Sequence, residues 1–367
     1  MSHRKKLEQA INFYHENDKK QCFDILKQLI TNRPDCARTL EYLIRIYFDN
    51  GHYQQAFNFA KQGLSYHKNY GFFHYTLGEI LLSSGYLRDA YPFLKQAVAL
   101  DKDVSQYVTA LADYYRKTGE QQTACQHYQR ALDCDSTNER ALMNYGNLLV
   151  EQGSDSEALP VYRRGAEISR GQKATFYRNI IYTSLKSGEL SDMHAYFREL
   201  LIKGELAAAK LYFHYLLSGH EMELLASLSQ VFREKFLSDI RIKNYLAIYY
   251  WLALEYEQCS ELVQAPLPEA ADKANESVAY IFLNYLKVLL SQPHGTQAAG
   301  DTRLYVLGES HSLGLNNSLL GWQGHSCLAQ TRFVMGAKMF HLSSPENNLM
   351  KLLLARQIAS IPRGSHL

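Results

Sequence analysis

Small and apolar residues recur at a fixed interval along residues 3–203. One glycine and one alanine return every 34 residues: Gly51, Gly85, Gly119 and Gly153, and Ala56, Ala90, Ala124 and Ala158. Around them the apolar positions follow the three- and four-residue spacing of a helix face. This pattern predicts six units, each of two helices joined by a tight turn. The units begin near His3, Ala37, Gly71, Ser105, Glu139 and Ala174.

Each unit places small residues where its two helices must approach each other, at Gly78 and Ala90 in the unit that starts at Gly71. A turn glycine, Gly85 in that unit, sits where a left-handed backbone is needed. In these positions residues 3–203 resemble the tetratricopeptide repeat family. The resemblance implies a mostly α fold, an α-solenoid wound as a right-handed superhelix, with six repeats over residues 1–203.

The repeat pattern weakens over residues 204–290, where Gly219 and Ala226 are seven positions apart instead of five. We expect degenerate repeats here, followed by a capping helix over Ser277–Leu290, because terminal repeats lack one neighbour. Residues 291–300 are polar and contain Gly and Pro, which indicates a linker.

The composition argues against several classes of function. A net charge of +2 argues against a nucleic-acid-binding protein. The six cysteines show no metal-ligand spacing, so we read them as reduced thiols and expect no metal and no cofactor. The N-terminal residues contain no apolar stretch of a secretory signal, and no apolar run is long enough to span a bilayer. We therefore expect a cytoplasmic protein without a transmembrane segment; its oligomeric state is not indicated.

In the tetratricopeptide family the first helix of each unit lines a concave groove. The resemblance implies that the groove-binding residues here are Arg38, Arg45, Phe72, Tyr75, Arg116, Lys117, Arg140, Asn147 and Arg178. Aromatic residues in the middle and arginines at the ends suit an extended peptide or protein segment with apolar anchors and acidic groups. The alternative is that these helix faces are solvated and bind nothing.

The chemistry changes after the linker. A β-rich run, residues 303–307, ends in Gly308-Glu309-Ser310-His311, and a strand that runs into a serine at a tight turn is one way to expose a nucleophile. The segment resembles the first block of the SGNH (GDSL-like) hydrolases. By that resemblance Ser310 is the catalytic nucleophile, and oxyanion stabilisation comes from the backbone of Ser310 and from Gly336.

We predict a small partial α/β segment over residues 301–367. Its expected order is strand, helix, strand, helix over residues 304–307, 312–320, 332–342 and 346–360. Glu309 stands where the SGNH family has aspartate, and no Asp-x-x-His follows Ser310. We expect a chain that is truncated or has decayed from a longer ancestor; residues 361–367 read equally as the approach to another strand or as an expression-vector scar.

Three functions remain open at this point. The first is a protein- or peptide-binding scaffold with an inactive SGNH-like appendix. The second is a serine esterase or acyl-transfer enzyme that uses Ser310, acting on acylated polysaccharide. The third is a solenoid accessory to glycan assembly or glycosyl transfer, because Asn144 and Asn179 occupy the same place in consecutive units, as in the asparagine ladder of repeat-bearing glycosyltransferases.

Overall fold

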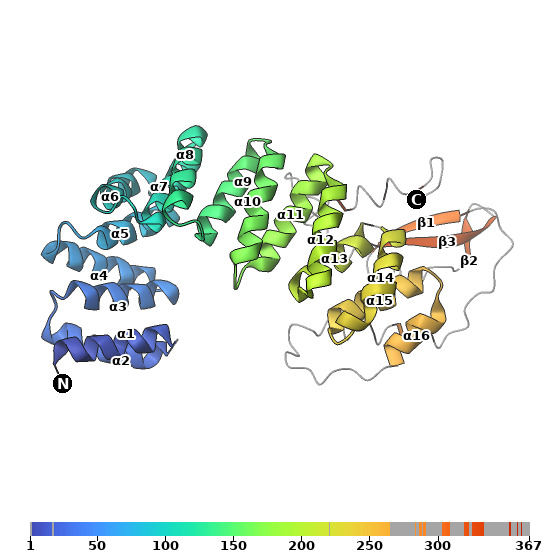
Figure 1. Ribbon diagram of the computed structural model, residues 1–367, viewed down its shortest axis with the longest axis horizontal. Helices are drawn as coiled ribbons and strands as arrows, with labels where there is room; N and C mark the ends of the chain where they lie inside the picture. Colours follow the sequence, from blue (N-terminus) through green and yellow to red (C-terminus); the bar gives the residue numbers. More distant parts are fainter. Residues whose placement is uncertain are drawn as a thin grey trace. The chain divides into compact units, whose positions relative to one another are not determined.

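The computed structural model describes residues 2–16, 18–219 and 221–264, the backbone of 303–308, 319–322 and 325–333, and isolated positions between 283 and 361. These residues belong to two compact units, residues 1–168 and residues 169–367 (Figure 1).

The first unit is built from consecutive helix pairs. Its described residues form α1 (His3–His15), α2 (Lys19–Asn32), α3 (Ala37–Asp49), α4 (Tyr53–Tyr66), α5 (Gly71–Ser83), α6 (Leu87–Leu100), α7 (Ser105–Thr118), α8 (Gln121–Cys134), α9 (Glu139–Glu151) and α10 (Asp155–Ile168). The predicted starts of the first five repeats coincide with the first residues of α1, α3, α5, α7 and α9.

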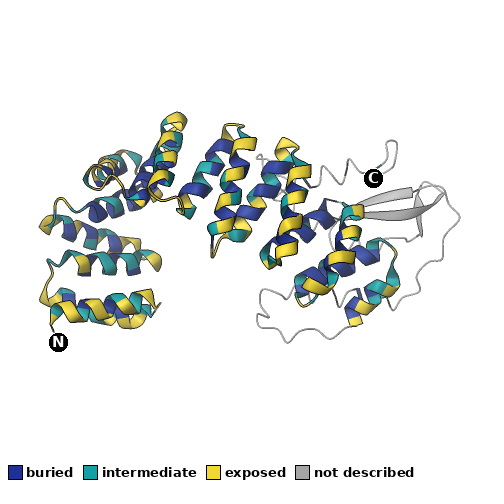
Figure 2. Cartoon of the chain, viewed as in Figure 1, coloured by how far each residue is buried: buried dark blue, intermediate teal, exposed yellow. Residues whose placement is uncertain are grey.

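The repeated glycines and alanines have the roles that their spacing predicts. The turn glycines adopt a left-handed backbone, with φ of 83° at Gly85 and 84° at Gly119. The repeated alanines are fully buried between helices, as at Ala90 and Ala124. Figure 2 shows the result: buried residues gather on the helix faces that meet, and exposed residues lie on the opposite faces.

In the third and fifth repeats the eighth position, Gly78 and Gly146, has no room for a large side chain. A β-carbon added to Gly78 would lie 2.6 Å from Cδ2 of Leu94, and one added to Gly146 would lie 2.4 Å from Cε1 of Tyr162. Because interiors are close-packed, these two glycines set how closely the helices of their pairs approach.

The second unit continues the helical pattern and adds a small sheet. Its described elements are α11 (Lys173–Ser187), α12 (Leu190–Lys203), α13 (Leu206–Ser218), α14 (Met222–Phe236), α15 (Ile240–Leu252), α16 (Tyr256–Gln264), β1 (Arg303–Gly308), β2 (Leu319–Trp322) and β3 (His325–Phe333). In the sixth repeat, α11 and α12, Met193 is fully buried where the second to fifth repeats have alanine. The helices α13 to α16 occupy the stretch expected to hold degenerate repeats.

The three strands form one sheet in the order β1, β3, β2. β1 pairs with β3 in parallel, with Arg303 opposite Leu328, and β2 pairs with β3 antiparallel, with Leu319 opposite Leu328. The expected strand over residues 304–307 lies within β1. Of the expected strand over residues 332–342, only 332 and 333 are described, and they form the end of β3, which begins at His325. Leu319 and Leu320, expected at the end of a helix, lie in β2. Short apolar runs do not distinguish helix from strand, because strand pairing is decided by distant neighbours.

Several expected features lie outside the described residues: the linker 291–300, most of the helix over 277–290 and most of the helix over 346–360. Leu353, one of the isolated described positions, is fully buried beside Gly219 after α13. In the described ranges no helix combines the length and the apolar character that a membrane span requires. The described cysteines are free thiols, and no three His, Cys, Asp or Glu residues of the described part are grouped to hold a metal.

Candidate functional site

The candidate site lies on α5, α7 and α9, the first helices of the third, fourth and fifth repeats. Its central residue, Arg140, is in the first turn of α9, and its position is fixed by the residue that caps this helix. The Asn138 side chain accepts a hydrogen bond from the backbone N–H of Ala141 at 3.0 Å, a standard N-cap contact. Its amide nitrogen donates to Ser105 at 2.7 Å and to Thr109 at 3.1 Å, both on α7. The cap therefore attaches the start of α9 to α7.

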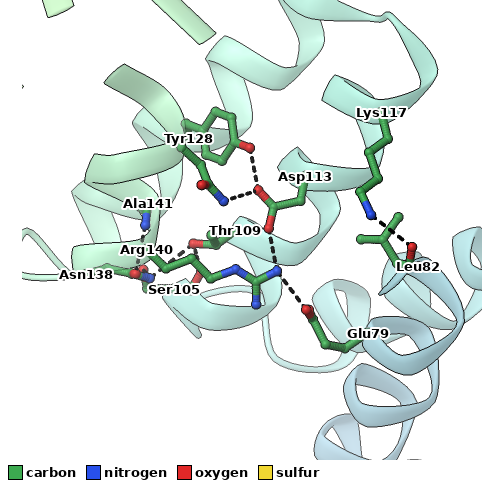
Figure 3. Close-up of polar contacts among 11 residues, drawn as sticks. Glu79, Leu82, Ser105, Thr109, Asp113, Lys117, Tyr128, Asn138, Arg140 and Ala141 are labelled. Carbon is green, nitrogen blue, oxygen red and sulfur yellow. Dashed lines mark hydrogen bonds and ion pairs between the residues drawn. The ribbon is translucent and has the colours of Figure 1, made fainter. Parts of the chain in front are cut away.

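Arg140 joins carboxylates from two preceding repeats (Figure 3). Its Nη2 donates to Oε1 of Glu79 at 2.7 Å and also to Oδ2 of Asp113. The Glu79 and Asp113 side chains are only 7% and 9% exposed, against 41% for Arg140. Burial alone would lower the pKa of Arg140, but Asp113 first and Glu79 second raise it above its usual value. The guanidinium thus stays charged and neutralises buried carboxylates that would otherwise be costly.

Asp113 is held from three sides. Besides Arg140, its Oδ1 accepts hydrogen bonds from the Tyr128 hydroxyl, on α8, and from the Asn144 amide at 2.7 Å. Burial and the adjacent Asp113 charge raise the pKa of Tyr128 far above its usual value, so the phenol keeps its proton and donates. A buried carboxylate that accepts several hydrogen bonds is fixed in one orientation.

These residues line a pocket of about 480 Å³ on the first helices of three successive repeats. We call it the α5–α7–α9 pocket; its lining residues are Glu79, Leu82, Ser83, Asp113, Arg116, Lys117, Arg140, Asn144 and Glu151. Three of them are acidic and three are basic, so the formal charges of the lining cancel. Concave, mixed polar and apolar pockets of this size are where ligands bind most often.

An aromatic strip on α5 and α7 consists of Phe72, Tyr75 and Tyr107; Phe72 and Tyr107 are buried, and Tyr75 is half-buried. The Tyr75 and Tyr107 rings stack with their centroids 5.0 Å apart, and the Arg45 guanidinium lies 4.6 Å from the Phe72 ring centroid. Burial first and the charge of Glu79 second raise the pKa of Tyr75 to about 12. Tyr75 and Glu79 are four residues apart on α5, so they lie on the same face of this helix.

The other predicted groove residues of the first unit are mostly engaged with their own chain. Arg45 pairs with Glu41 at 2.8 Å, and Arg116 pairs with Glu151 on α9. Lys117 donates to the backbone carbonyl of Leu82 at 3.0 Å. Asn147 accepts a hydrogen bond from the Tyr162 hydroxyl at 2.7 Å.

The remaining predicted residues are not part of the α5–α7–α9 pocket. Arg38 is exposed on α3, and Arg178 is exposed on α11 in the second unit. Ser310 and Gly336 lie outside the described residues. The predicted site residues did not include Tyr128, which lies on a second helix, or Asn138. Asn138 could have been found from the sequence, because an asparagine before an apolar run is a recognisable helix start.

The chain matches no family model and no curated protein sequence. It is similar to solved helical proteins. TTC0263 of Thermus thermophilus, described as a thermophilic TPR protein, is 17% identical, with 49% of this chain and 100% of that chain covered and a TM-score of 0.44. PilF of Pseudomonas aeruginosa is 14% identical, with 54% and 90% covered and a TM-score of 0.46. MamA of Desulfovibrio magneticus is 18% identical, with 46% and 96% covered and a TM-score of 0.38.

The description of the fold rests on the spacing of this chain's own helix pairs and on their left-handed turn glycines. The chain has a tetratricopeptide-like helical repeat fold.

Proposed function

We propose that this protein is a scaffold that binds a protein or an extended peptide through the first helices of its repeats. The observation that carries the proposal is the α5–α7–α9 pocket together with the aromatic strip. A partly exposed aromatic ring, that of Tyr75, on the helix that also carries Glu79 of the pocket offers both the apolar contact and the polar orientation that a peptide ligand needs.

The polar side of this surface is already organised in the free chain. Arg140, Asp113 and Asn144 are fixed by hydrogen bonds to one another, so a ligand does not have to order them. Ordering interface side chains is one of the main costs of association, and preorganised groups avoid it. Binding at this face is therefore favoured over binding at the second helices, whose exposed residues form no comparable network among the described residues.

Affinity purification with full-length variants tests the proposal. The binding variant carries Tyr75→Ala, Arg116→Ala and Arg178→Ala. The matched control carries Arg88→Ala, Gln96→Ala and Gln126→Ala, three exposed residues of α6 and α8. We expect the first variant to lose specific partners that the control retains. Retention of every partner by the first variant would exclude binding through the first helices.

We also propose that residues 1–203 form the repeat array, residues 204–290 its degenerate end, residues 291–300 a linker and residues 301–367 an SGNH-like segment without appreciable esterase activity. Two observations support the SGNH-like nature of the segment. β1 pairs with β3 in parallel, and β1 ends at Gly308, two residues before Ser310. A serine hydroxyl without a positioned base is a poor nucleophile.

An esterase that uses Ser310 is the second candidate function, and the position of β1 is the observation that favours it. Hydrolysis of p-nitrophenyl acetate by the full chain, compared with Ser310→Ala, distinguishes the two. We expect equal, near-background rates. Turnover that Ser310→Ala abolishes would establish the enzyme. The glycan hypothesis has less support, since the Asn144 amide is used to hold Asp113.

A further inference from the structure

One oxygen of the Glu79 carboxylate has no hydrogen-bond partner. Oε1 accepts from Arg140, but Oε2 is buried and no donor among the described residues lies within hydrogen-bond distance of it. The side chain that carries it is only 7% exposed. Most buried polar atoms in proteins are hydrogen-bonded, and each exception asks for an explanation. Glu79 lines the α5–α7–α9 pocket, so a donor can reach it from there.

The basic residues of the pocket are committed elsewhere. Arg116 donates through Nε and Nη2 to Glu151, and Lys117 donates to the Leu82 carbonyl. Arg140 already serves Glu79 at the other oxygen. None of these cations donates to Oε2 of Glu79, and a bound molecule can supply that donor without disturbing the contacts that they make.

The inner part of the pocket also has a charge excess. Glu79 and Asp113 are two buried carboxylates that share the single guanidinium of Arg140, which leaves one formal negative charge among these three groups. Lys117, the cation that balances it in the whole lining, is an exposed residue. A buried negative charge favours a cationic occupant, and a charged donor makes a stronger hydrogen bond than a neutral one.

We propose that the α5–α7–α9 pocket receives a lysine or arginine side chain of the bound peptide, whose cationic nitrogen donates to Oε2 of Glu79. An apolar residue of the peptide contacts Tyr75, the partly exposed ring of the aromatic strip, because Tyr75 and Glu79 are four residues apart on one face of α5. This inference rests on the proposed function and specifies its ligand: an extended segment with one basic residue next to an aromatic or aliphatic anchor.

The test is a selection of random peptides displayed on phage against the immobilised full-length chain. The selected peptides are then resynthesised and their affinities are measured for the wild type, Glu79→Gln, Tyr75→Ala and the control Gln126→Ala. Glu79→Gln keeps the shape of the side chain and removes its charge. A second version of each peptide carries norleucine in place of the basic residue and leaves the protein unchanged, so it is informative even where a variant folds poorly.

We expect a lysine or arginine at one fixed position of the selected peptides. Its replacement by norleucine should weaken binding to the wild type roughly tenfold or more, the range for a hydrogen bond to a charged group. The same replacement should have little effect on binding to Glu79→Gln. Peptides that need Tyr75 but show no basic position, or that lose as much affinity for Glu79→Gln, overturn the basic-residue inference alone. The absence of selected peptides, or peptides insensitive to Tyr75→Ala, overturns the proposed function and the inference with it.

Discussion

Gly78 and Leu94 pack against each other inside the third helix pair, where a β-carbon on Gly78 would lie 2.6 Å from Cδ2 of Leu94. Two effects therefore oppose each other in Gly78→Ala. Alanine in place of glycine inside a helix stabilises the fold by up to about 1 kcal/mol, whereas the close contact of the new β-carbon with Leu94 destabilises it. We expect a small net change. In Gly78→Leu the steric term dominates, and we expect destabilisation of roughly 1–3 kcal/mol from overpacking.

Urea denaturation followed by circular dichroism measures both variants. Gly171→Ala is the matched control, since a β-carbon at Gly171 would meet no atom within 4 Å. A Gly78→Leu protein as stable as the wild type would mean that the third helix pair does not need its close approach.

Substitutions at Gly119 measure how much the left-handed backbone conformation alone contributes to stability. Its φ is 84°, and a β-carbon there would meet no atom within 4 Å, so the cost of a side chain is conformational and not steric. We expect Gly119→Ala to lose about 1–2 kcal/mol of unfolding free energy and Gly119→Asn to lose less, because asparagine tolerates the left-handed region. Equal losses for the two variants, measured by the same denaturation experiment, would contradict this explanation.

Arg140→Ala should destabilise the first unit more than Arg116→Ala. The first change leaves the buried carboxylates Glu79 and Asp113 without their shared cation, at a cost of about 1–3 kcal/mol. The second leaves Glu151, whose side chain is 46% exposed, and an exposed pair contributes less than about 1 kcal/mol. Thermal unfolding of the two variants under the same conditions gives the comparison. The reverse order would show that water reaches the inner carboxylates.

The stability of the second unit should fall as the pH is lowered from about 6.5 to about 4. Burial first and the nearby Arg178 second lower the pKa of His214 from 6.5 to about 4. Between these values the unfolded chain binds a proton that the folded chain excludes, so acid favours unfolding, and the effect of this group levels off below pH 4. His214→Gln should flatten this part of the profile, whereas His52→Gln, at an exposed turn, should not. Superimposable profiles for the wild type and His214→Gln would refute the assignment.

The sequence predicted those features of the fold that depend on neighbouring residues. Gly85 and Ala90 have their roles within a single helix pair, and repetition of the pair makes the signal visible. The start of α11 was expected at Ala174 and is at Lys173, because the sixth repeat has a longer first helix. The part of β3 before Arg332 was not predicted, because its pairing with β1 joins residues far apart in the chain.

The candidate site was predictable only in part, for a related reason. Helix periodicity shows that Glu79, Asp113 and Arg140 belong to faces on the same side of the array. It does not show that one guanidinium joins both carboxylates, since that depends on how three repeats pack. Arg140 was expected to bind an acidic group of a partner. It instead forms ion pairs with Glu79 and Asp113 of its own chain.

The ion pair between Arg140 and Glu79 spans 61 residues and connects the fifth repeat with the third. In an ordinary solenoid each repeat contacts only its immediate neighbours, and stability is a sum of nearest-neighbour contributions that allows the array to melt from its ends. A bond that passes over the fourth repeat adds a next-nearest-neighbour contribution. We therefore expect repeats three to five to unfold together, and the outer repeats of the first unit to open while the α5–α7–α9 pocket stays intact.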